Sequence, residues 1–344
     1  MSEVPSEFDD ESRLENEIAE LESQLAAARQ RLSTKRRVAA NPGPQQQQQQ
    51  QQHMLSPARA LLDSSRHYLL LLSDSALPLG SFAFSSGLES YLAHARARSQ
   101  SRPPPSSAQP QKPSFASFLP LSLSSYASTA LPFVLAAHRD PEAVAELDDV
   151  LDASIICAVG RRASIAQGRA LLSIWEKSLA PSSSVTPGAR KILDAFSAAL
   201  RRSSASASAS ASAYSRKTGG EAAADGDDDD DDDDDTGGLP PPVSAHLAPL
   251  FGAVARLLGL TLRQAAYVFL LSHAKALVSA AVRASVFGPY QAQKVLAGEE
   301  LQVLIADMVQ REWDVRVEDA GQSVPVMDLW IGRHEMLYSR IFNS

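Results

Sequence analysis

The sequence of 344 residues contains a single cysteine, Cys157, so no disulfide can form within the chain. One cysteine is also too few for a structural zinc site of the common cysteine-rich kind. Both absences are typical of a reducing compartment, and we expect the protein to be cytoplasmic. The acidic first ten residues lack the apolar run of a signal peptide.

Long uninterrupted apolar runs are also missing. The most apolar stretch, residues 265–282, is interrupted by His273 and Lys275. A membrane-spanning helix would place both side chains near the bilayer centre, where a lysine costs about 2.5–3.5 kcal/mol. The stretch therefore predicts a buried helix of a soluble protein that makes no membrane contact.

The net charge of −8 comes from one segment of the chain. Residues 221–235 hold 11 acidic residues and no basic one, so 40 − 11 = 29 acidic residues face 32 basic ones elsewhere. A block of this kind is typical of a solvated insert and says little about what the folded part binds. The basic pairs Arg161-Arg162 and Arg201-Arg202 are too sparse for a nucleic-acid surface, and no aromatic platform accompanies them.

Near the N-terminus, residues 9–37 predict one helix with apolar residues at alternating steps of four and three. This a/d pattern of a coiled coil is formed by Leu14, Ile18, Leu21, Leu25, Ala28 and Leu32. It spans only about three heptads, a length at which an isolated helix is marginal. A dimerising coiled coil and a lone solvated helix therefore both remain open.

Polar, low-complexity segments divide the rest of the chain, and such segments cannot bury enough apolar surface to fold. The predicted organisation is an N-terminal helical extension at 1–40, a Gln/Pro linker at 41–60, a single helical domain at 61–325 with disordered inserts at about 99–113 and 203–243, and a C-terminal tail at 326–344. The Ser-Ala repeats after residue 203 could continue the preceding helix for a turn or two.

Between the inserts the apolar residues recur at helical spacing, while the alternation typical of strands is nearly absent. Asp140-Pro141 and Thr261 are typical helix starts, and Gly259 is a typical helix end. The expected helices are 115–138, 141–159, 161–179, 186 to beyond 200, 245–258, 261–287, 291–297 and 299–313. The fold is therefore predicted to be an all-α bundle.

Motifs of common catalytic sites are absent from the sequence. It has no phosphate-binding Gly-x-x-x-x-Gly-Lys-Ser/Thr loop and no Gly-x-Ser-x-Gly elbow. His334-Glu335 begins like the zinc motif His-Glu-x-x-His, but Tyr338 occupies the position of the second histidine. We predict no catalytic residue and no metal ligand, and we interpret Cys157 as a core residue.

The last stretch of the chain, residues 328–344, is rich in aromatic residues and arginine. Such residues dominate the energetics of protein interfaces. From composition alone, a partner-binding surface and a segment packed on its own bundle are equally well supported.

Four fragments resemble the urease accessory family UreF. They are a Ser-Ala-Leu-Pro-Leu-Gly and Gly-Leu-Glu signature at 72–91, a Ser-x-x-Gln-Gly fragment at 162–172, a His-x-x-x-x-Phe-Gly step at 246–252 and an Arg-His-Glu-x-x-Tyr-Ser-Arg-Ile-Phe tail at 333–344. Each fragment is weak alone, but the four occur in the order of the family. The N-terminal helix and the low-complexity inserts resemble additions found in a eukaryotic member, as in fungi.

The resemblance implies an all-α protein that pairs with itself and has no enzymatic activity. It implies a complex with homologues of UreD (also called UreH) and of the GTPase UreG, acting on apo-urease. Nickel would be handled transiently by the complex, with no cofactor bound firmly to this chain. GTP hydrolysis by UreG would be coupled to metal insertion.

The resemblance also implies which residues bind partners. Those expected to dock on UreD and order the UreG-facing surface are Arg333, His334, Glu335, Tyr338, Ser339, Arg340 and Phe342. Those expected near UreG or the dimer interface are Pro78, Gly80, Phe82 and Glu89.

An alternative function is a GTPase-activating protein that supplies a catalytic arginine to the nucleotide of a partner GTPase. Such arginines lie exposed beside the phosphates of the partner. The candidates for that role are Arg161, Arg162 and Arg340.

Overall fold

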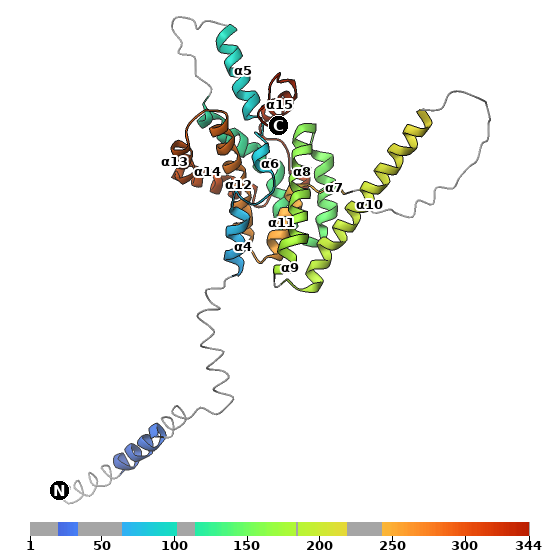
Figure 1. Cartoon of the computed structure of the whole chain (residues 1–344). Helices are drawn as coiled ribbons and strands as arrows, with labels where there is room; N and C mark the ends of the chain where they lie inside the picture. Colours follow the sequence, from blue (N-terminus) through green and yellow to red (C-terminus); the bar gives the residue numbers. More distant parts are fainter. Residues whose placement is uncertain (1–19, 34–63, 102–113, 184, 219–242, 344) are drawn as a thin grey trace, which may run out of the picture. The chain divides into compact units, whose positions relative to one another are not determined.

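The computed structural model describes residues 20–33, 64–101, 114–183, 185–218 and 243–343 (Figure 1). The predicted Gln/Pro linker, most of the insert after Ser101 and the aspartate run lie outside these ranges, as do the ends of the heptad helix. The chain divides into two compact units, residues 1–63 and 64–344.

The described part of the first unit is one helix, residues 20–33. All its side chains are exposed, including those of Leu21, Leu25 and Leu32. The helical part of the heptad prediction is confirmed for these residues, and the apolar seam has no partner within the described residues of this unit.

The described residues of the second unit form helices joined by turns and contain no strand, which confirms the predicted all-α fold. The helices are α4 (Ser64–Ser73), α5 (Leu88–Ser101), α6 (Phe115–Arg139), α7 (Val144–Ser154), α8 (Ala158–Ile174), α9 (Ala180–Ser182), α10 (Pro187–Thr218), α11 (Leu247–Leu257), α12 (Leu262–Arg283), α13 (Pro289–Ala297), α14 (Glu299–Glu312) and α15 (Val326–Arg333). The short helical turns are η1 (Ser81–Ala83), η2 (Pro141–Ala143), the π-helical η3 (Trp175–Leu179), η4 (Val317–Asp319) and η5 (His334–Met336).

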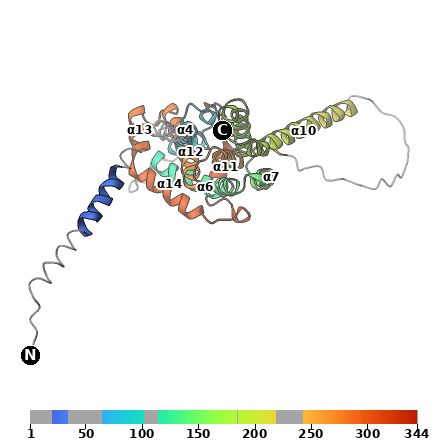
Figure 2. The same ribbon diagram turned by 90° about the horizontal axis from the view of Figure 1, so that it is seen from below.

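Helix α6 is the central element of the bundle, and α11, α12 and α14 pack against it (Figures 1 and 2). It begins at the N-cap Ser114, whose side chain accepts the backbone N–H of Ser117. Helix α11 approaches α6 closely at Gly252, where an added Cβ would lie 2.3 Å from the carbonyl oxygen of Val134. Close packing of this kind requires glycine at the contact.

Helices α6 and α12 are long and apolar enough to cross a membrane, judged by length and composition alone. Within the bundle, however, 72% and 56% of their most apolar windows are buried. Such burial is typical of core helices, and it agrees with the buried helix that the sequence predicts for residues 265–282.

Several helix boundaries follow the sequence signals. Thr261 and Gln264 form a capping box at the start of α12, and the Asp140 side chain accepts the N–H of Glu142. Gly259 follows α11 with a φ of 81°, the left-handed conformation that suits a helix end.

Three other boundary predictions were wrong. Helix α7 ends at Ser154 and not at 159, because Ile155 is extended and starts a loop before α8. Helix α12 ends at Arg283 and not near 287, because Ser285 adopts a positive φ of 57° and the Val286 N–H bonds back to Ala281. The insert predicted from 203 begins later, because α10 continues to Thr218.

Candidate functional site: the docked C-terminal segment

The C-terminal segment, defined here as residues 326–343, begins with α15, which packs against α5, α6 and α8. The Trp330 ring contacts Tyr91 of α5 at 4.8 Å and Phe118 of α6 at 5.9 Å between centroids. Gly87 adopts a φ of +85°, and an added Cβ there would lie 3.1 Å from the backbone nitrogen of Ile331. The helix therefore rests directly on the turn that precedes α5.

The carboxylate of Glu89, in the first turn of α5, holds the end of the segment. Its Oε2 accepts from His334 Nε2 at 2.9 Å and from the Phe342 N–H at 3.3 Å, and its Oε1 accepts from the Ile341 N–H at 2.8 Å. The side chains of His334 and Glu89 are 0% and 12% exposed. One nearly buried carboxylate thus satisfies three donors from residues more than 240 positions away in the sequence, and such charge-assisted bonds are strong.

Arg283, at the end of α12, completes the attachment. Its guanidinium lies 4.4 Å from the centroid of the Phe342 ring and donates to the carbonyl oxygen of Phe82. The Asn343 N–H donates to the carbonyl oxygen of Ala83 at 2.8 Å. Partial burial lowers the pKa of Arg283 below its ordinary value, although a guanidinium stays charged in proteins.

The structure brings together two groups of predicted site residues that are far apart in the sequence. Glu89 contacts the tail directly through His334. Phe82 is linked to the tail indirectly, because its carbonyl oxygen accepts from Arg283, whose guanidinium contacts the Phe342 ring. Pro78 and Phe82 are exposed, whereas Gly80 is half-buried and adopts a φ of +73°. The 78–89 turn and the C-terminal segment therefore form one site.

The predicted tail residues divide into interior and exposed groups. His334 and Phe342 were expected to dock on a partner, but both are buried, at 0% and 4% exposure. His334 bonds to Glu89, and the Phe342 ring packs against the guanidinium of Arg283. In this structure they anchor the segment. The exposed group consists of Arg333, Glu335, Tyr338, Ser339 and Arg340.

Sequence reasoning missed four residues that hold the segment, namely Tyr91, Phe118, Arg283 and Trp330. Tyr91 lay inside a recognised fragment and Trp330 lay in the aromatic-rich stretch 328–344, but nothing in their spacing indicated that they meet. Arg283 lay at the end of a helix, and no residue near it in the sequence indicated its contact with Phe342. Only the tertiary fold brings these side chains together.

The exposed face of the segment combines apolar and charged groups. Met336, Tyr338 and Ile341 are exposed, as is Ile156 in the loop before α8. Glu335 forms an ion pair with Arg162 of α8. Such a mixture of aromatic, aliphatic and charged side chains is typical of a protein interface.

The three arginines considered for catalysis differ in their partners. Arg161 donates twice to Asp152, at 2.6 and 2.7 Å, and Arg162 is paired with Glu335. Arg340 is exposed and forms no ion pair with any residue that the structure describes. Among the three, Arg340 is the one whose guanidinium is free to meet a partner in this conformation.

A cavity of about 330 Å³ lies among α6, α8, α11 and α12 and is closed on one side by the C-terminal segment. Its polar lining includes Ser122, Gln167, His273 and Asp328. His273 Nε2 lies 3.0 Å from Ser122 Oγ, and its ring stacks on Tyr126 at 4.0 Å. Burial lowers the pKa of His273 to about 3, so the imidazole is neutral at physiological pH.

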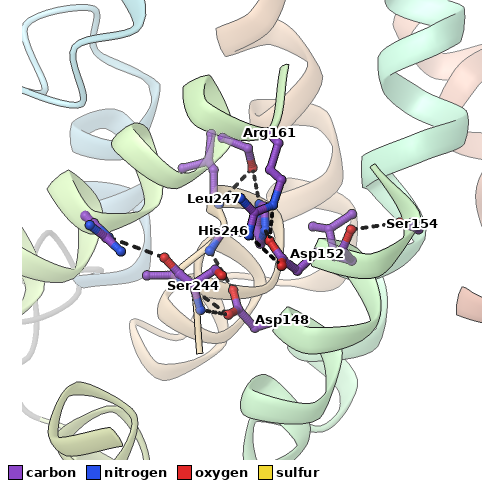
Figure 3. A network of polar contacts seen from close by, with 11 residues as sticks. Asp148, Asp152, Ser154, Arg161, Ser244, His246 and Leu247 are labelled. Atoms are coloured by element: carbon purple, nitrogen blue, oxygen red, sulfur yellow. Dashed lines mark hydrogen bonds and ion pairs between the residues drawn. The ribbon is translucent and has the colours of Figure 1, made fainter. Parts of the chain in front are cut away.

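A second polar network, shown in Figure 3, fixes the backbone of residues 244–246 just before α11. Asp148 of α7 accepts the N–H groups of Ser244, Ala245 and His246 at 2.6, 3.0 and 2.5 Å. Gly168 of α8 lies against the same backbone, because an added Cβ would be 2.1 Å from the carbonyl oxygen of Ala245. Helices α7 and α8 thus hold the start of α11 from two sides.

The imidazole of His246 connects α7 and α8. Its Nε2 lies 2.7 Å from Asp152 Oδ1 and its Nδ1 lies 3.0 Å from Ser164 Oγ. Burial alone would raise the pKa of Asp152, but hydrogen bonds from Arg161 and His246 hold it below its ordinary value. Ser, His and Asp also meet in hydrolase triads. Here, however, Arg161 offsets the charge of Asp152, and the Leu247 N–H points at Ser164 Oγ, so the group is suited to fixing backbone.

Among the residues that the structure describes, no three histidine, cysteine, aspartate or glutamate side chains lie together as a metal site. Cys157 is half-buried, and its Sγ would lie 3.9 Å from a Cβ added at Gly332 of α15. The thiol therefore packs beside the C-terminal segment.

Residues 111–299, more than half of the chain, match the family model named UreF. The chain belongs to the UreF family. The matched range contains two of the four recognised fragments, those at 162–172 and 246–252, which build the network around His246. The two fragments that build the docked C-terminal segment lie outside it.

Relatives of this UreF chain come from fungi, plants and bacteria. A fission yeast protein described as an uncharacterized urease accessory protein UreF-like (Schizosaccharomyces pombe) is 36% identical over 81% of this chain and 97% of its own length. Urease accessory protein F of Oryza sativa subsp. indica is 29% identical over 79% and 82%. Urease accessory protein UreF of Paenarthrobacter aurescens is 28% identical over 79% and 95%. The relatives support a eukaryotic member of the family.

Proposed function

We propose that this chain is an accessory protein of urease maturation that acts as a scaffold. It holds a UreD/UreH homologue and a UreG homologue together at apo-urease and couples GTP hydrolysis by the UreG homologue to nickel insertion. The chain itself carries out no chemical step. Membership in the UreF family and the names of its relatives support the accessory role.

The observation that carries the scaffold proposal is the docked C-terminal segment. Three bonds to Glu89 hold its backbone and His334, while Tyr338 and Arg340 stay exposed. An interface anchor binds more tightly when it is presented in a fixed conformation, because less entropy is lost on association. The segment thus offers an aromatic residue and a free arginine, two residue types that dominate interface hot spots.

The cargo and the assembly belong to the same proposal. Nickel passes through the complex as its substrate and does not stay bound to this chain. The protein pairs with a second copy and works in the cytoplasm. The 78–89 turn, which holds the segment through Glu89, lies close to the UreG homologue or to the dimer interface.

The alternative, a catalytic arginine given to the GTPase, applies above all to Arg340, since Arg161 and Arg162 are engaged in ion pairs. GTP turnover by the UreG homologue, measured with saturating amounts of wild-type or Arg340→Ala protein, separates the two functions. The scaffold proposal expects equal turnover once the complex is saturated. A catalytic arginine would instead cost about 10³-fold or more even at saturation, which would overturn the scaffold proposal.

A further inference from the structure

The helix at residues 20–33 presents an apolar stripe to solvent. Leu21, Leu25 and Leu32 are 57%, 50% and 61% exposed, and Ala28 lies on the same stripe. These residues occupy successive a and d positions of a heptad, with Leu25 and Leu32 at a and Leu21 and Ala28 at d. Isolated helices of about 12–15 residues are marginal in water, so a helix of this length needs a partner for its stripe.

The charged residues beside the stripe indicate which helix it binds and whether the two helices run parallel or antiparallel. With Leu25 at a, Glu22 and Arg29 occupy e positions and Arg31 a g position, and these positions set the orientation of a coiled coil. In a parallel pair of identical helices, each g residue faces the e residue five positions further on. Within the described helix this places Gln24 opposite Arg29, so a parallel pair gains no attraction between opposite charges.

In an antiparallel pair of identical helices, e residues face e residues, and the N-terminal half of one helix lies beside the C-terminal half of the other. When residues 20–33 of the two helices overlap fully, Leu21 of one copy packs against Leu32 of the other. In the same register, Leu25 of one copy packs against Ala28 of the other. In that register Glu22 of each helix faces Arg29 of the other, so two attractive pairs form. Exposed ion pairs contribute only about 0.2–1 kcal/mol each, so they select the orientation while the leucine layers supply the binding.

We propose that the N-terminal helix binds the same helix of a second copy of this chain as an antiparallel coiled coil. The proposal rests on the exposed leucine stripe and the Glu22/Arg29 complementarity within residues 20–33. It is independent of the urease function, because it concerns a different unit of the chain.

Cross-linking of the full-length chain tests the proposal directly. Cys157 is the single cysteine, so a Cys157→Ser background leaves only introduced thiols. Leu21→Cys chains are mixed with Leu32→Cys chains and oxidised with oxidised glutathione. Antiparallel pairing places these two thiols in one layer, whereas two copies of position 21 lie about 16 Å apart along the axis.

The expected result is about tenfold more disulfide-linked dimer in the mixture than in either chain alone. Ser23→Cys, at the solvent-facing f position of the same helix, is the matched control and should not cross-link. Cross-linking of Leu21→Cys alone would establish a parallel pair and overturn the proposal. Absence of cross-linking in every sample, which would also be the result if a different protein covered the stripe, would equally overturn it.

A charge reversal gives a second, independent readout in the same assay. Glu22→Lys should reduce cross-linking several-fold, because the introduced ammonium group would then face Arg29 of the second copy. Adding Arg29→Glu should restore it, since the attractive pairs reform with reversed signs. Unchanged cross-linking in Glu22→Lys would show that Glu22 does not face Arg29 of the second copy and would contradict the antiparallel register.

Discussion

Replacing Gly168 by alanine is expected to destabilise the helical domain by about 3 kcal/mol, at the upper end of the range for overpacking. The new Cβ would lie 2.1 Å from the carbonyl oxygen of Ala245 and 2.6 Å from the carbonyl carbon of His246. Both are backbone atoms held by Asp148, so they cannot move aside as a flexible side chain would. Relief requires α8 to separate from the start of α11.

Gly188 provides the matched control, because it is also a helical glycine but has no atom within 4 Å of an added Cβ. Gly188→Ala is expected to leave stability unchanged or raise it by about 0.5–1 kcal/mol, since alanine favours helix. Urea unfolding followed by circular dichroism gives both free energies. Equal stability of the Gly168→Ala variant and the wild type would contradict the close contact of α8 with the start of α11.

Replacing Glu89 by alanine is expected to release the C-terminal segment from the bundle. The change removes the acceptor for His334 and for the N–H groups of Ile341 and Phe342. Leaving a buried donor such as His334 Nε2 unpaired costs about 1–3 kcal/mol, but detachment lets water satisfy it. We therefore expect a loss of about 2 kcal/mol in the free energy of unfolding and fast hydrogen exchange at the Ile341 and Phe342 amides.

Glu146 provides the control for this change, because it lies in the first turn of α7 as Glu89 lies in that of α5, but its side chain is exposed. Glu146→Ala should leave exchange at Ile341 and Phe342 as in the wild type. Unchanged exchange at these amides in Glu89→Ala would show that the other contacts hold the segment and that Glu89 is not its anchor.

Local sequence signals predicted the helices well because they depend on neighbouring residues. The capping box at Thr261 and the helix end at Gly259 each depend on residues only a few positions apart in the sequence. The end of α7 could not be predicted in the same way, because the apolar spacing continues through Ile155 although the backbone there is extended. The local apolar pattern therefore does not show where the backbone leaves the helix.

The site was predicted as two sets of residues but not as one structure. Glu89 and His334 were both named, yet they lie 245 positions apart, and no local pattern indicates that they bond. The composition of the tail left an interface and self-packing equally open. The structure shows self-packing for Phe342, which is buried, and leaves Tyr338 exposed, because residues of an irregular segment can face opposite sides.

The most direct measurement of the scaffold account is co-purification of this chain with its UreD and UreG homologues. The Tyr338→Ala/Arg340→Ala variant is compared with the wild type, with Tyr290→Ala as the control for an exposed tyrosine elsewhere. The account predicts that the double variant loses about 2 kcal/mol or more of binding, roughly 30-fold, at an unchanged melting temperature. Binding of both partners at wild-type strength by the double variant would contradict it.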